Sequence, residues 1–198
     1  EVKFWLAFSE YFVELDFSIG GSLFGLPKII LKDEDSYEAF NYYRSTAWKV
    51  RGVDEPLNSL RFAGNNHLYS YRFDWDDQRR FIIADFKKLF GATHALEVPL
   101  LSGDKSLVGG RPVSNFVYPR GISNRYISRN MMKFWTNFAK KGEPGFSTNN
   151  IEWKPYSASD SNSRSFMILD NKKNLRMSSE MSSLKLLTRE LFNDERLN

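Results

Sequence analysis

The chain has 198 residues, enough for a single domain with a substantial buried core. Hydrophobic residues make up 41% of the sequence and aromatic residues 16%, a composition that argues against disorder. The formal net charge of +4 is spread along the chain, without the dense basic stripe typical of a nucleic-acid-binding protein. The absence of Cys excludes disulfides and cysteine metal sites within this chain, and two His are too few for a histidine-rich metal site.

The sequence contains no candidate membrane-spanning segment and no recognisable targeting signal. No apolar run approaches 18 residues, so a transmembrane helix is not expected. The lack of Cys and of Asn-x-Ser/Thr sequons favours a cytoplasmic location, although a secreted one stays open. The amino terminus has neither a signal peptide nor an initiator Met, and we expect the chain to begin within a longer gene product.

In chain order, the first expected element is a helix. Aromatic residues at helical spacing predict it over residues 1–15, and the glycines and proline that follow predict a loop over residues 16–32. A second helix is expected over residues 36–50, with Asp33 or Asp35 as its capping residue.

Gly52 is expected to end that second helix, and a shorter helix should follow with Pro56 in its first turn. Alternation of aromatic with other side chains predicts a strand over residues 67–75. Residues 102–122 are rich in Gly and Pro and are expected to form a long loop.

The strongest helix prediction covers Ser123 to Gly142, where one apolar stripe repeats at helical spacing. A buried strand is expected over residues 165–170 and a last helix over residues 182–194. Helices and strands in this order indicate an α/β domain. Two clear strands make a marginal sheet, so we expect part of the sheet to lie outside this chain.

His94 is the main candidate for chemistry. It lies about twenty residues after the expected aromatic strand, with apolar residues directly after it. A His in such a loop can shuttle protons, because its unperturbed pKa is near neutrality. From these residues alone, a structural His bonded to a backbone carbonyl is the favoured interpretation.

Two further groups have open alternatives. Asp74, Asp76 and Asp77 form an acidic cluster that is interpreted as a solvated turn, with cation binding as the alternative. Met131, Met132 and Trp135 are expected to pack in the core, with the lining of an acyl pocket as the alternative.

Several ordered motifs occur over residues 66–175. The first is the segment GATHALEVPLLSG, which resembles the motif that carries the catalytic His of type B carboxylesterases and cholinesterases. A helix motif with Met-Met, Trp, Phe-Ala, Gly and Pro follows about thirty residues later, and then a Trp-x-x-Tyr motif and a Leu-Asp strand. The matching residues are His94, Glu97, Pro99, Gly103, Ser128, Arg129, Met131, Met132, Trp135, Phe138, Ala139, Gly142, Pro144, Trp153, Pro155, Tyr156, Leu169 and Asp170.

The resemblance implies that residues 1–198 are the carboxyl-terminal part of a single α/β-hydrolase domain, with a mixed, mostly parallel sheet flanked by helices. It implies that His94 is the catalytic base of a Ser-Glu-His triad, with Glu97 supporting its loop. It also assigns the catalytic acid to Glu1, although Val2 stands where the family usually has Gly. Glu1 would accept a hydrogen bond from the His94 ring and hold its tautomer.

The nucleophile and the oxyanion donors of this family have no match in the chain. No Gly-x-Ser-x-Gly occurs, and Gly20-Gly21 and Gly109-Gly110 both follow the acid, whereas the family places its oxyanion glycines before the serine. The implied activity is therefore hydrolysis of a small-molecule carboxylic ester, without a cofactor or metal, by this chain together with the amino-terminal part of the same protein. Two alternatives remain: a non-catalytic cholinesterase-like adhesion or binding protein, and a free-standing small domain.

Overall fold

The structure, a computed structural model, describes residues 12–18, 22–23, 26–82, 84–107, 110–157, 163–181 and 183–197. The expected helix over residues 1–15 lies mostly outside these residues, and so does Glu1. Its described end is not helical, because Val13–Asp16 forms strand β1.

The segment that was expected to be a loop over residues 16–32 contains two strands, β2 (Ser22–Leu23) and β3 (Leu26–Leu31). β3 pairs antiparallel with β1, and Leu15 lies opposite Ile29. The loop prediction was wrong because it gave more weight to the glycines and the proline than to Ile29 and Ile30. These β-branched residues favour a strand when a partner strand is available.

Helix α2 (Glu34–Lys49) confirms the second expected helix, with Asp33 as its cap: the Asp33 carboxylate accepts a hydrogen bond from the Ser36 N–H. Gly52 does not end the helical path. The chain continues through a π-helical segment, η1 (Val50–Asp54), into helix α3 (Glu55–Phe62), which has Pro56 in its first turn as expected.

The central sheet has the strand order β4-β7-β8, and its strands are β4 (Tyr71–Phe73), β7 (Ser163–Leu169) and β8 (Arg176–Met181). β4 runs parallel to β7, and β7 runs antiparallel to β8. The strand expected over residues 67–75 is therefore shorter than its alternating pattern suggested. β8 was not predicted, since its polar sequence shows no alternation of apolar residues.

The chain between β4 and the second half of the molecule folds into short elements. The loop expected over residues 102–122 was wrong: it contains a 3-10 turn and an eight-residue helix. The short elements are β5 (Arg80–Phe81), β6 (Ala84–Asp85), α4 (Phe86–Leu89), α5 (Glu97–Ser102), η2 (Lys105–Leu107) and α6 (Gly110–Val117).

The last helices agree with the sequence. Helix α7 (Ile122–Lys141) ends at Gly142, whose φ of 76° makes it a left-handed cap. Helix α8 (Leu184–Phe192) is capped by Ser183, and η3 (Glu195–Leu197) follows it.

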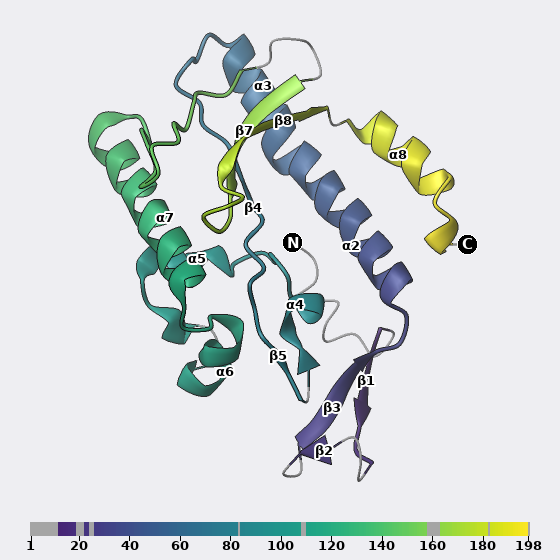
Figure 1. Cartoon of the computed structure of the whole chain (residues 1–198). Helices are drawn as coiled ribbons and strands as arrows, with labels where there is room; N and C mark the ends of the chain where they lie inside the picture. The colour runs from purple at the N-terminus through teal and green to yellow at the C-terminus, as the bar shows by residue number, and fades with distance from the viewer. Residues whose placement is uncertain are drawn as a thin grey trace.

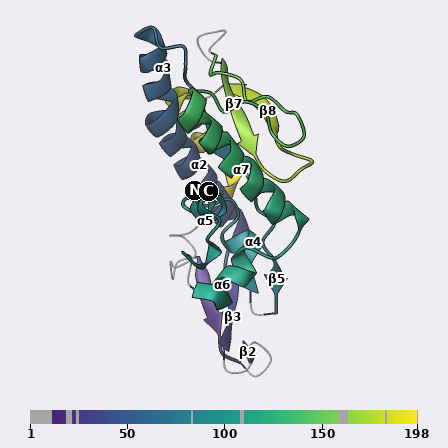
Figure 2. The same cartoon turned by 90° about the vertical axis from the view of Figure 1, so that its left-hand side faces the viewer.

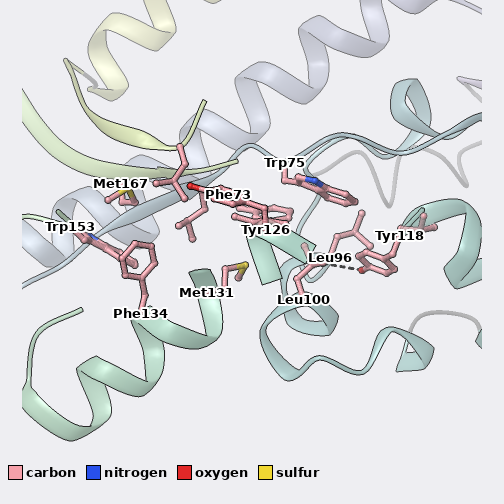
Figure 3. Close-up of a cluster of buried hydrophobic side chains, with 14 residues drawn as sticks. Phe73, Trp75, Leu96, Leu100, Tyr118, Tyr126, Met131, Phe134, Trp153 and Met167 are labelled. Atoms are coloured by element: carbon pink, nitrogen blue, oxygen red, sulfur yellow. Dashed lines mark hydrogen bonds between the residues drawn. The ribbon is translucent and has the colours of Figure 1, made fainter. Parts of the chain in front are cut away.

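The largest core lies between α7 and one face of the central sheet. Met167 of β7, labelled in Figure 3, packs with α7 on this face together with Leu169, whereas Phe166 contacts Lys49 and Arg72 on the other face. Figure 1 shows α7 and α2 on opposite sides of the sheet, and Figure 2 shows that their axes are roughly aligned. The paired strands β1 and β3 project beyond the amino-terminal end of α2. The fully buried members from α7 include Ile127, Met131 and Phe134.

Candidate active site

His94 lies on a turn between α4 and α5, and its side chain is exposed. The turn starts where α4 ends. It is closed by two backbone hydrogen bonds, from the Leu96 N–H to the Thr93 carbonyl (3.3 Å) and from the Val98 N–H to the Ala95 carbonyl (3.2 Å). Because Thr93 and Leu96 are buried on either side of it, the turn presents the imidazole of His94 to the surface.

The residue after His94 has an unusual backbone conformation. Ala95 has a φ of 71°, and within the described residues the other non-glycine residue with positive φ is Asn150. Asn adopts this conformation with ease, whereas Ala does so at a cost of about 1–2 kcal/mol. Such strain persists where the surroundings fix the backbone, and it often marks functional sites.

Both ends of the His94 turn are fixed by buried side chains. The Gln78 side-chain amide donates to the Gly91 carbonyl (2.7 Å), and the Tyr118 hydroxyl donates to the Leu96 carbonyl (2.9 Å; Figure 3). Burial raises the pKa of Tyr118, and the Glu97 carboxylate adds to the rise, so the hydroxyl stays a neutral donor. Side chains from other parts of the chain, Gln78 and Tyr118, thus fix the conformation of the turn.

An aromatic side chain from a distant helix contacts the imidazole. The ring centroids of Trp48 and His94 are 5.0 Å apart, with an angle of 52° between the ring planes. Trp48 belongs to the last turn of α2 and is itself 46% exposed. This contact was not predicted, since neither residue stands out in the sequence as a partner of the other.

Of the two site residues that the sequence predicts, the structure places His94 in an accessible position. Glu1 lies outside the described residues, so its role as the acid stays a prediction. Within the described part of the chain, no hydrogen bond reaches a ring nitrogen of His94. Glu97 lies in the first turn of α5, where a carboxylate is favourable at a helix amino terminus.

The acidic cluster after β4 has structural partners. Asp74 pairs with Arg72 (2.7 Å), Asp76 pairs with Lys87 (3.1 Å), and Asp77 accepts a hydrogen bond from Ser123. No group of acidic or histidine side chains suited to a metal ion occurs among the residues that the structure describes.

The Met-Trp group of α7 divides between interior and surface. Met131 is fully buried in the main core and Trp135 packs against that core, whereas Met132 is 39% exposed. Core packing, the first interpretation of this group, therefore holds for Met131 and Trp135 and was wrong for Met132, which faces the outer side of the helix. In the described segments, no helix is long and apolar enough to cross a membrane.

Comparison with known proteins identifies the family. The carboxylesterase family profile matches residues 33–187, and the chain belongs to this family. Membership confirms the expected α/β-hydrolase fold class, of which the β4-β7-β8 sheet and its flanking helices are a part.

Two curated relatives are bile salt-activated lipases. The chain is 34% identical to that of Bos taurus and 31% identical to that of Rattus norvegicus, in each case over 104 residues. These matches cover 50% of this chain and 15% of each lipase. Among solved structures, a PNB esterase matches with 24% identity and a TM-score of 0.39, over 63% of this chain and 21% of the esterase.

Proposed function

We propose that this chain supplies the catalytic base, His94, of a carboxylic ester hydrolase whose nucleophilic serine lies in polypeptide outside the chain. The observation that carries the proposal is the His94 turn. An exposed imidazole is presented by a backbone that is strained at Ala95 and fixed by Gln78 and Tyr118, in a member of the carboxylesterase family. Strained backbone that is held in place by its surroundings is often found at active sites.

In the proposed reaction, His94 accepts the proton of the serine hydroxyl as the serine oxygen attacks the ester carbonyl carbon. The imidazolium then donates this proton to the departing alcohol oxygen, which leaves an acyl-serine. Water attacks the acyl carbon in the second half, again with His94 as base, and the carboxylic acid departs as the serine regains its proton. The reaction needs no metal or organic cofactor.

Glu1 is proposed to orient the imidazole by accepting a hydrogen bond from its Nδ1–H and to stabilise the imidazolium. The substrate class is a small-molecule carboxylic ester, in keeping with the two relatives that are named lipases. The oxyanion donors and the nucleophile would come from the amino-terminal part of the same protein.

Substitution of the two histidines in the complete protein tests the proposal. His94→Ala should lower kcat for p-nitrophenyl ester hydrolysis by at least about 10³-fold, as expected for the loss of a triad base. His67→Ala is the matched control, because His67 is also exposed but precedes β4, and it should retain turnover within about twofold. Equal turnover of the His94→Ala variant and the parent would refute the assignment.

A fluorophosphonate probe separates the enzyme from the non-catalytic alternative. The probe should label one serine of the complete parent protein and should label the His94→Ala variant far more slowly, because the base that activates the serine is gone. A folded complete protein that takes no label at all would favour a binding protein on the same fold.

A further inference from the structure

The contact between Trp48 and His94 joins two parts of the fold that the proposed chemistry does not otherwise connect. Trp48 comes from α2, on one side of the central sheet, and His94 comes from the turn before α5. The 5.0 Å between their ring centroids lies within the range of favourable aromatic contacts and of cation–π attraction.

The end of α2 that carries Trp48 is firmly anchored. The ammonium group of the next residue, Lys49, lies 2.9 Å from an oxygen of Asp54 and 2.9 Å from an oxygen of Glu180 on β8. Asp54 is buried, and Lys49 also lies over the ring of Phe166. These bonds tie the last turn of α2 to the sheet, so the indole is presented from a rigid support.

The glycine at position 52, in η1, leaves space for the indole of Trp48. A Cβ added at Gly52 would lie 3.4 Å from Cδ1 of Trp48, so the ring lies close along the surface of η1. The indole is therefore supported on one side by the helix and contacts the imidazole of His94. These two contacts restrict the rotation of the half-exposed ring.

We infer that Trp48 is a positioning residue for His94. Its ring restricts the rotation of the imidazole and stabilises the imidazolium that forms when His94 accepts the serine proton. This inference rests on the proposed function and deepens it, since it names a residue outside the triad that favours the charged state of the base. The π-electrons of an indole attract a cation more strongly than they attract a neutral imidazole, so the contact acts in the transition state more than in the ground state.

The test uses the complete protein with Trp48→Leu, Trp48→Phe and a control, Phe62→Leu, which removes a 98% exposed aromatic ring from α3. Trp48→Leu should lower kcat about two- to fivefold, the fold-change expected for a half-exposed cation–π contact, with KM nearly unchanged. Trp48→Phe keeps an aromatic ring and should recover most of the loss. Phe62→Leu should match the parent.

The second readout is the NMR shift of the carbon-bound ring protons of His94, assigned by their loss in His94→Ala. Trp48→Leu should remove the ring-current shift that the indole imposes on them, while the thermal unfolding midpoint stays near that of the parent. A Trp48→Leu enzyme with parental kcat and parental His94 shifts would overturn the inference. So would a rise in KM at constant kcat, which would make Trp48 a substrate contact.

The outcomes separate this inference from the proposed function. If His94→Ala retains full turnover, both fall together. If His94→Ala is inactive while Trp48→Leu works at parental speed, the function stands and the positioning role alone is refuted.

Discussion

Tyr118→Phe tests the idea that the His94 turn is fixed from outside. The hydroxyl of Tyr118 donates to the Leu96 carbonyl at 2.9 Å, and both residues are almost completely buried, with exposures of 1% and 3%. The substitution deletes one oxygen and leaves the ring in place, parallel to Trp75 at a centroid distance of 6.0 Å. Its effect therefore reports on the hydrogen bond and not on packing.

The magnitude follows from the partner that is left behind. A buried carbonyl without a donor costs about 1–3 kcal/mol, whereas the lost hydroxyl itself needs no replacement in an apolar site. We expect Tyr118→Phe to lower the free energy of unfolding by about 2 kcal/mol. Because Leu96 is two residues from the imidazole, kcat for ester hydrolysis should fall as well, by less than about tenfold.

Urea unfolding of the complete protein, followed by tryptophan fluorescence, measures the first effect as a lower midpoint at unchanged slope. Tyr69→Phe is the matched control. Tyr69 is partly buried against Phe138, and its hydroxyl makes no hydrogen bond with any other described residue. If the two variants lost the same small amount of stability, the Tyr118 hydroxyl would not be holding the turn.

Three further substitutions test other parts of the structure. Burial raises the pKa of Asp170, and repulsion from nearby carboxylates adds to the rise. The protonated side chain therefore contributes stability that is fully present below the unfolded pKa of about 3.8. This contribution is lost as the pH rises through the folded pKa. Asp170→Asn should therefore gain stability relative to the parent between pH 3.5 and pH 7 in urea unfolding, and a constant difference would contradict this. Ala95→Gly should raise the free energy of unfolding by about 0.5–1 kcal/mol, because glycine adopts the positive φ without strain. Ester turnover should not rise. A loss of stability in urea unfolding would argue against strain at this residue. Asp54→Ala breaks a buried ion pair with Lys49 and should cost about 3 kcal/mol in the same assay, with a cost below about 1 kcal/mol counting against the anchoring of α2.

Local pattern was enough to predict the elements with a clear period. The apolar stripe of α7, the capped start of α2 and the apolar strand β7 were found because each carries its signal within one segment. β8 and α6 were missed because β8 is mostly polar, with Met177 and Met181 too far apart to show a strand period, and α6 lies among glycines and prolines. In both, tertiary partners decide a conformation that the local sequence leaves open.

The candidate site divides in the same way. His94 was predicted from the resemblance of its segment to the family's His motif, and its catalytic role stays a prediction. Trp48, Gln78 and Tyr118 were not, since each reaches the turn from another element and no spacing along the chain records such a contact. Glu1 remains a prediction from the sequence.

The π-helical segment η1 sets the angular relation between two helices that would otherwise be one. In an α-helix each residue turns the chain by about 100°, so deletion of one residue from Val50–Asp54 would rotate every side chain of α3 by about that angle relative to α2. Asn58 of α3, which accepts a hydrogen bond from the Tyr156 hydroxyl at 2.7 Å, would then face another direction. The length of η1 therefore determines that α2 directs Trp48 toward His94 while α3 directs Asn58 toward Tyr156.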